Sequence, residues 1–361
     1  MKNKILMLII ILLIFLVGIV GYFQLVKNIQ PAKEKLSSVL NVYNWEDYIG
    51  DTTIEDFEKE FGVKVNLQIY DNEDTMLSSI QSNPSGYDIV VASDILVREM
   101  INMKLLSPIN LNNIPNFKNI AGEYKNPSYD PGNKYSVPYM WGTSGLVINR
   151  KYIKETEPSW SILWNPEYKG KISMLYNMQD VIGAALRYLG YSANSIDPAE
   201  LEEARILLLK QKPLLRGYED NVTIKDDLIS EKLWAGHNYS GEGSFAADKN
   251  ENLEYVIPKE GGFIWVDNLL IPISAQHKYT AEVFINFVLR SDVSAKIANY
   301  LWYANTNEAA RELTNPEILQ DFSLYPPEET KKNLEFSGYF GGVEAVALYN
   351  QIWAELQHSE E

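Results

Sequence analysis

The sequence predicts an α/β protein of two lobes with a ligand site between them. Three observations support this fold class. Strand-like and helix-like segments alternate over residues 39–91, and the same alternation returns over residues 171–289. The ~325 residues after the apolar N-terminus exceed the usual size of one hydrophobic core. Because ligands of such sheets bind beyond the carboxyl ends of the strands, we expect the functional residues there.

The first 35 residues stand apart from this fold. Residues 5–26 form an uncharged run that, as a helix, would span roughly 33 Å, enough to cross a bilayer core. A secretory signal peptide needs small residues at its cleavage site, whereas Ile19 and Val20 are bulky. We therefore expect an uncleaved anchor in the cell membrane, with the remainder extracellular or periplasmic, in preference to a cleaved signal peptide.

The net charge argues against one class of partner. It is −16 overall, and residues 1–35 contain five lysines and one glutamate, which leaves about −20 for the rest. Nucleic-acid binding relies on basic patches, so we expect no nucleic acid as a partner. An acidic surface is compatible with a cationic ligand. The absence of cysteine from the sequence removes disulfides and thiolate chemistry.

The first half of the fold is predicted from a β-α-β-α-β pattern. Residues 39–43 form an apolar strand, and residues 52–61 combine the Thr-x-x-Glu pattern of a capping box with helical spacing. Residues 63–69 alternate as a half-buried strand. A helix over about residues 73–82 and a strand over residues 87–91 complete the unit. This order predicts a parallel sheet with helices on both faces.

The second half repeats the same kinds of element. A strand at residues 171–175 is followed by a helix over residues 198–211, which the preceding Asp197 caps. A further strand is expected at residues 254–257 and a helix at residues 280–289. After the anchor and linker (1–35), we expect lobe 1 at residues 36–143 with 268–312 returning to it, and lobe 2 at residues 144–267 with 313–361.

The usual signatures of catalysis and metal binding do not fit. The three histidines, His237, His277 and His358, lack the spacing of metal ligands, so we expect no metal site. The glycine clusters at residues 142–145 and 240–244 match neither a nucleophile elbow nor a phosphate loop. We therefore expect a protein that is not an enzyme and that needs no cofactor.

Trp265 and Asp267 point instead to the binding of a cation. They stand two residues apart after a glycine pair, and in an extended segment such residues face the same side. An indole and a carboxylate on one face offer a cation a π surface and a counter-charge. An aromatic face contributes about 0.5–2 kcal/mol to an alkyl ammonium, and a charge-assisted hydrogen bond about 1.5–3 kcal/mol.

The same residue types recur at predicted strand ends and loops. They are Trp45, Glu46, Asp47 and Tyr48; Ser93 and Asp94; Asn177 and Asp180; Tyr239 and Glu242; and Tyr303. Their chemistry fits a small polycation. It also fits a sugar, and a surface glycosidase with paired carboxylates is a more remote interpretation.

Five segments resemble the spermidine/putrescine-binding proteins of bacterial polyamine ABC transporters, over about residues 40–330. They are residues 43–48, 87–91, 130–139, 163–170 and 258–267. The resemblance implies a two-lobed periplasmic-binding-protein fold of type II, which closes a cleft on its ligand. It also implies a monomer that delivers a polyamine to the permease subunits of an ABC importer. Another cationic amine or an oligosaccharide is the alternative ligand.

The resemblance also implies roles for single residues. Trp45 is expected to stack on the alkyl chain of the ligand and Asp180 to hold an ammonium group, while Trp265 and Asp267 match the family's aromatic and carboxylate pair. Further ligand positions fall on Asp47, Tyr48, Tyr239 and Tyr303, and Ser93 and Asp94 join the expected site from the end of the third strand.

Three positions depart from the family pattern. Ile95 stands where an aromatic residue is common, Asn177 replaces an acidic residue, and Ser337 stands where the family has a glutamine. One carboxylate fewer favours putrescine over spermidine as the ligand. Glu46 or Glu242 could restore the missing charge.

Overall fold

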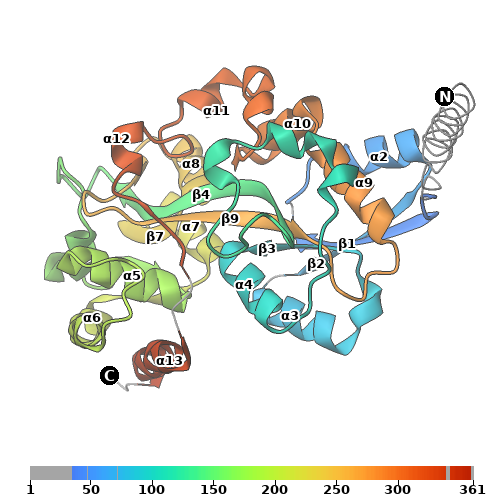
Figure 1. Cartoon of the computed structure of the whole chain (residues 1–361). Coiled ribbons are helices and arrows are strands. Elements are labelled where there is room, and N and C mark those ends of the chain that lie inside the picture. The colour runs from blue at the N-terminus through green and yellow to red at the C-terminus, as the bar shows by residue number, and fades with distance from the viewer. Residues whose placement is uncertain (1–34, 47, 71, 339–341, 359–361) are drawn as a thin grey trace, which may run out of the picture. The chain divides into compact units, whose positions relative to one another are not determined.

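The computed structural model describes residues 35–46, 48–70, 72–338 and 342–358 (Figure 1). The strands of this part are β1 (Val39–Trp45), β2 (Lys64–Tyr70), β3 (Ile89–Ser93), β4 (Ser136–Asn149), β5 (Ile172–Leu175), β6 (Gly217–Glu219), β7 (Ala235–Tyr239), β8 (Leu253–Val256), β9 (Phe263–Leu270), β10 (Ala304–Asn305) and β11 (Glu335–Phe336). The α-helices are α2 (Thr53–Phe61), α3 (Glu73–Ser82), α4 (Asp94–Asn102), α5 (Met178–Leu189), α6 (Pro198–Gln211), α7 (Asn221–Ile229), α8 (Ser240–Lys249), α9 (Lys278–Val288), α10 (Ser291–Leu301), α11 (Pro316–Gln320), α12 (Glu328–Lys331) and α13 (Gly342–His358).

The strands form one connected sheet with the main order β2-β1-β3-β9-β4-β7-β5-β6. At one end β1 pairs in parallel with β2 and β3, and at the other β5 pairs in parallel with β6 and β7. Between them, β3–β9, β9–β4 and β4–β7 are antiparallel. The parallel sheet predicted from the order of the elements over residues 39–91 is confirmed for β1, β2 and β3, whereas the antiparallel centre of the sheet was not predicted. The β-α-β pattern describes only the two ends, which the long strand β4 joins by running in the opposite direction to its neighbours.

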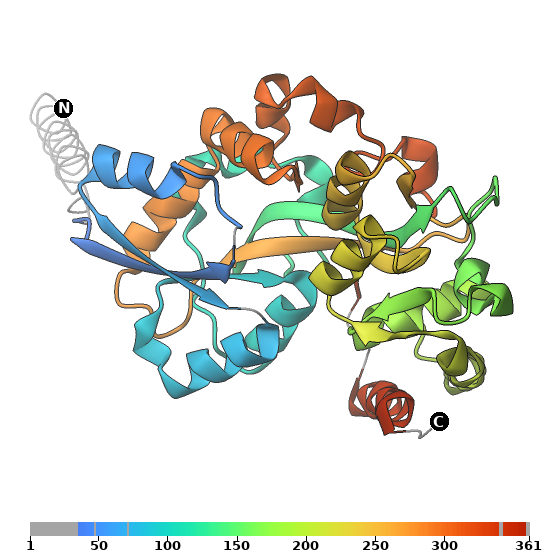
Figure 2. The same ribbon diagram turned by 180° about the vertical axis from the view of Figure 1, so that it is seen from behind.

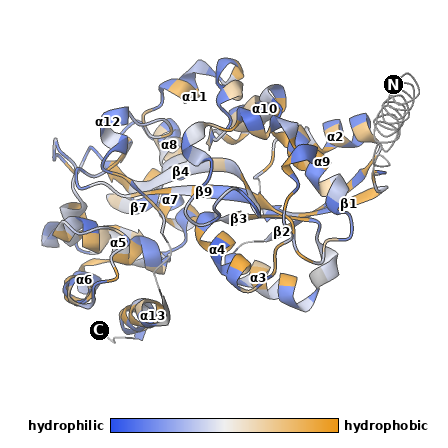
Figure 3. Ribbon diagram, in the orientation of Figure 1, coloured by the Kyte–Doolittle hydropathy of each residue, from blue (hydrophilic) through white to orange (hydrophobic). Residues whose placement is uncertain are grey.

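Helices cover the two ends of this sheet. Figures 1 and 2 show α2, α3, α4 and α9 around β1–β3, and α5, α6, α7 and α13 around β5–β7, with β4 and β9 passing between the two groups. One core cluster contains Met76 and Met100, and a larger one contains Trp160 and Tyr349, the latter from α13. Figure 3 shows hydrophobic bands along helices that are hydrophilic elsewhere, as helices that cover a sheet require.

Two helix starts test the capping predictions. Asp197 accepts hydrogen bonds from the backbone N–H groups of Ala199 and Glu200, so the predicted N-cap of α6 is confirmed. The capping box at Thr52 is wrong, because the Thr52 hydroxyl makes no cap bond and donates instead to the Asp56 carboxylate at 2.9 Å. With φ −106° and ψ 8°, Thr52 lacks the extended backbone that an N-cap residue usually adopts.

The strand β2 is more exposed than the alternation of its residues predicted. Val65 and Tyr70 are buried, but Leu67 and Ile69 are 38% and 53% exposed. β2 is the edge strand of the sheet and pairs with β1 alone among the described strands, so one side of it lacks a neighbouring strand.

Asp130 fixes the start of β4. Its buried carboxylate accepts hydrogen bonds from three backbone N–H groups, those of Lys134, Tyr135 and Ser136, and from the Ser136 hydroxyl at 2.7 Å. We expect Asp130→Ala to lower the free energy of unfolding by about 3–5 kcal/mol, because it leaves buried donors unpaired. Urea unfolding measures this loss. The exposed-site variant Asp248→Ala is the control, and equal stabilities of the two variants would contradict this account of Asp130.

Candidate functional site

The predicted residue Asp267 lies where β3, β9 and β4 run side by side. Strand register places it opposite Ser93, the last residue of β3, and opposite Met140 of β4. The Tyr48 hydroxyl donates to the Asp267 carboxylate at 2.7 Å, and the Tyr139 hydroxyl donates to the Tyr48 carbonyl at 3.1 Å. Burial raises the pKa of Asp267 to about 7, although the Tyr48 hydrogen bond acts to lower it.

The predicted aromatic residues form one chain of ring contacts. The Trp265 ring centroid lies 5.9 Å from that of Tyr239 and 6.1 Å from that of Tyr303. Tyr303 in turn lies 5.8 Å from Tyr48. Trp265 Nε1 is buried and has no hydrogen-bond partner among the described residues. The structure therefore brings four of the predicted aromatic residues together.

Two glycines make room for these rings. A Cβ atom on Gly142 would lie 2.3 Å from Cζ2 of Trp265, and one on Gly241 would lie 2.0 Å from Cζ of Tyr303. Both contacts are closer than a side chain permits. Sequence reasoning tested these glycine clusters only as nucleophile or phosphate turns and missed this role. The signal that could have revealed it is the position of Gly142 on a strand next to an aromatic-rich strand.

Asp180 forms a second acidic position at the start of α5. It is buried, and the Tyr239 hydroxyl donates to its carboxylate at 3.2 Å. Asn177 caps the helix by accepting from the Gln179 and Asp180 N–H groups. Burial raises the pKa of Asp180 to about 6. His237 Nε2 lies 3.9 Å from Asp180, but burial lowers the pKa of His237 to about 3, so this histidine is neutral and supplies no counter-charge.

Glu46 and Glu242, the two glutamates that could restore the missing charge, differ in position. Glu242 is half-buried and accepts from the Tyr303 hydroxyl at 2.5 Å and from the Asn221 side-chain amide at 3.0 Å. Its two oxygens are therefore both engaged by the protein. Glu46 is exposed and joins none of these contacts.

Ser93 is in contact with Glu73, an acidic residue that was not predicted from the sequence as part of the site. Glu73 accepts from the Ser93 N–H at 2.8 Å and from the Ser93 hydroxyl at 2.9 Å. Asp94 is buried, and its Oδ2 atom has no hydrogen-bond partner in the described part of the chain. Burial and then the nearby Asp267 raise the pKa of Asp94.

The remaining predicted residues have more local surroundings. The Trp45 ring packs 4.3 Å from the Tyr70 ring, against the first core cluster, and no ring contact links it to Trp265. The Ser337 N–H donates to the carbonyl of Ile264, the residue before Trp265. Asp47 lies outside the described residues.

Three buried aspartates of the site have no lysine or arginine partner in the described part of the chain. No lysine or arginine among the described residues forms an ion pair with Asp94, Asp180 or Asp267. Buried carboxylates are normally paired, because burial of an isolated charge is costly. Carboxylates beside aromatic faces, with no cation supplied by the protein, suit a ligand that brings its own positive charge.

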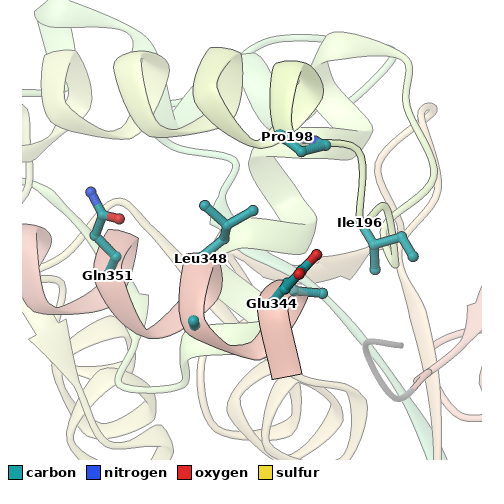
Figure 4. A pocket seen from close by; sticks show the side chains of 7 residues that line it. Ile196, Pro198, Glu344, Leu348 and Gln351 are labelled. Carbon is teal, nitrogen blue, oxygen red and sulfur yellow. The ribbon is translucent and has the colours of Figure 1, made fainter. Parts of the chain in front are cut away.

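A pocket of about 570 Å³ lies elsewhere, between the start of α6 and α13 (Figure 4). Its lining residues are Ile196, Pro198, Glu344, Ala345, Ala347, Leu348 and Gln351. None of these residues is aromatic, and the only carboxylate, that of Glu344, is on an exposed residue. The lining of this pocket therefore does not combine aromatic rings with buried carboxylates, as the surroundings of Trp265 and Asp267 do.

An α/β sheet shared by two groups of helices, with ligand-type side chains where its central strands meet, defines a two-lobed solute-binding protein. The chain belongs to the bacterial extracellular solute-binding protein family, which it matches over residues 52–326.

Three known proteins are similar to the chain over most of its length. The chain is 36% identical over 323 residues to the spermidine/putrescine-binding periplasmic protein of Salmonella typhimurium, covering 89% of this chain and 92% of the relative. It is 32% identical over 314 residues to the putrescine-binding periplasmic protein PotF of Escherichia coli, covering 82% and 85%. A solved structure, a putative spermidine/putrescine ABC transporter from Listeria monocytogenes, has a TM-score of 0.82 at 35% identity and covers 90% of this chain and all of that one. The resemblance and the two-lobed fold that it implied are confirmed.

Proposed function

We propose that this chain is the extracellular substrate-binding component of an ABC importer and that it captures a polyamine. The observation that most strongly supports this proposal is the group of buried carboxylates that lie beside aromatic rings and have no cationic partner among the described residues. The names of the relatives support the same ligand class. Function then consists of capture, closure and delivery to the permease by a monomer, with no covalent step.

The register of the central strands supports an elongated ligand with a cation at each end. Asp267 lies opposite Met140 of β4, and Tyr239, which holds Asp180, lies opposite Ser144. Four residues of strand separate these positions, or roughly 13 Å. Trp265 lies between them, opposite Gly142. In our proposal each terminal ammonium pairs with one of the two aspartates, and the alkyl chain lies against the Trp265 ring.

Two further features of the proposal concern selectivity and the lobes. Asn177 uses its side chain to cap α5. The preference for putrescine over spermidine, which the sequence analysis based on this residue, stays a prediction. We place lobe 1 at residues 36–143 and 268–312, and lobe 2 at residues 144–267 and 313–361. This division is supported by the contact of Phe57 with Phe284 and by the packing of α13 on α5 and α6.

The membrane anchor is likewise a proposal. Its apolar run, residues 5–26, lies outside the described residues. Among the described helices, none combines the length and apolar character needed to cross a bilayer. We propose that residues 5–26 tether the binding lobes to the outer face of the cell membrane.

Calorimetric titration of residues 36–361 with putrescine, spermidine and spermine tests the ligand class. We expect micromolar or tighter binding to at least one of them. The matched control is 1,4-butanediol, which has the chain length of putrescine without its charges and should give no binding. No heat with any of the three polyamines would move the ligand assignment to another amine or to an oligosaccharide.

The affinity should depend on pH because an ammonium pairs only with an ionised carboxylate. In the ligand-free protein the pKa of Asp267 is about 7 and that of Asp180 about 6, so both lose charge as the pH falls below these values. We expect affinity to be highest near pH 8 and to fall roughly 100-fold by pH 5 from Asp267 alone. Titrations in one buffer series measure this, and an affinity that is flat between pH 8 and pH 5 would contradict the pairing.

A further inference from the structure

We propose that Glu73 is a positioning residue of the ligand site, which holds the turn between β3 and α4 so that Asp94 presents an unpaired oxygen beside Asp267. This inference rests on the proposed function. Glu73 is the first residue of α3 and is not among the residues that the sequence singled out.

The hydrogen bonds of Glu73 carry the inference. Both of its carboxylate oxygens accept from one residue, Ser93, at 2.8 Å from the backbone N–H and 2.9 Å from the hydroxyl. Ser93 ends β3 and is also the N-cap of α4, where its hydroxyl accepts from the Leu96 N–H. A two-point contact to the N-cap fixes both the backbone and the side chain of this turn. Glu73 thereby determines where α4 begins.

The turn places Asp94 at the site. Ser93 lies opposite Asp267 in the β3–β9 register, so Asp94 directly follows the position that faces Asp267. The Oδ1 atom of Asp94 accepts from the Ile95 N–H at 3.0 Å, whereas Oδ2 is buried without a partner among the described residues. An unsatisfied buried acceptor is energetically costly, and the ammonium of a ligand would relieve that cost.

The charges around Glu73 have one sign. The titratable groups that act on it are Asp74, on its own helix, and Glu99 of α4, and Glu73 in turn acts on Asp94, Asp267, Tyr70 and Tyr239. None of the described lysines or arginines pairs with Glu73. In the described part of the chain, no group of three or more histidine, cysteine, aspartate or glutamate side chains is placed to hold a metal ion. Glu73 therefore adds negative potential behind the site, and an organic cation is the counter-charge that fits.

Two variants distinguish the effect of Glu73 on the position of the turn from the effect of its charge. In Glu73→Gln the amide oxygen can still accept from the Ser93 N–H and the amide nitrogen can donate to the Ser93 hydroxyl, so the turn is kept and the charge is lost. In Glu73→Ala both are lost. We expect polyamine affinity at pH 8 to fall about 30-fold in the Ala variant and about threefold to tenfold in the Gln variant.

The pH dependence of polyamine affinity distinguishes this role from a purely structural one, which would leave that dependence unchanged. In Glu73→Gln the loss of affinity on acidification should begin at lower pH than in the wild type, because Asp267 and Asp94 lose a like-charged neighbour. The control is Asp248→Asn, which removes an exposed carboxylate outside these contacts and should leave both the affinity and the profile as in the wild type. Wild-type affinity and an unshifted profile in both Glu73 variants would overturn the role in binding.

Hydrogen exchange of the ligand-free protein tests the positioning itself. The amides of Ser93 and Leu96 should exchange at least tenfold faster in Glu73→Ala and at the wild-type rate in Glu73→Gln. Unchanged exchange in Glu73→Ala would overturn the inference. This test does not depend on the proposed function. If the wild type bound no polyamine, the ligand assignment would be wrong, but hydrogen exchange would still test whether Glu73 positions the turn.

Discussion

Asp267→Asn is expected to weaken polyamine binding about 100-fold, because it removes the charge and keeps the shape of the side chain. A charge-assisted hydrogen bond contributes about 1.5–3 kcal/mol, and each 1.4 kcal/mol is tenfold in affinity. The asparagine can still accept from the Tyr48 hydroxyl, which now donates to Asp267 at 2.7 Å. The loss should therefore come from the unpaired ammonium of the ligand and not from a collapsed site.

Calorimetry at pH 8 measures this effect, with Asp248→Asn as the matched control. Asp248 is exposed and pairs with its neighbour Lys249, so its variant should bind like the wild type. Unchanged affinity in Asp267→Asn would remove Asp267 from the site. Equal losses in the two variants would show that overall negative charge, and not a specific pair, attracts the ligand.

The second large effect is expected from Gly142→Ala. The added methyl group would lie 2.3 Å from the Trp265 ring and 2.8 Å from the Ser240 hydroxyl, so the ring must move. Displacement of a well-packed group costs about 1–3 kcal/mol, and Trp265 is the ring that links Tyr239 to Tyr303. We expect affinity to fall by about tenfold to 100-fold, with the stability of the ligand-free protein lowered as well.

Gly122→Ala is the control for this substitution. A Cβ atom at Gly122 meets no other atom within 4 Å, so the same chemical change should leave affinity unchanged. Binding titrations and thermal unfolding of both variants measure the outcome. If Gly142→Ala bound polyamine with wild-type affinity, then the position of the Trp265 ring would be irrelevant to the ligand.

Local patterns in the sequence predicted the parts of the site that depend on neighbouring residues. Trp265 and Asp267 were expected on one extended segment, and both lie on β9. The helix expected over residues 73–82 is α3, with the same bounds. These features follow from side-chain alternation and from helix-start chemistry, which act within a few residues of one another.

The remaining features depend on pairing between distant strands. The approach of Asp267 to Ser93, and therefore the relevance of Glu73, follows from the register of β9 on β3. Trp45 lies opposite Tyr70 in the parallel β1–β2 pair, which explains its packing on that ring. The spacing of residues along the chain does not determine such registers, since they are set by the whole sheet.

A crystal structure of residues 36–361 with putrescine or spermidine would test the central claim most directly. We predict a ligand nitrogen within about 3 Å of the Asp267 carboxylate, another near Asp180, and the alkyl chain against the face of Trp265. A ligand bound elsewhere, or one held at this position without contact to either carboxylate, would contradict the claim that the ligand supplies the missing positive charge.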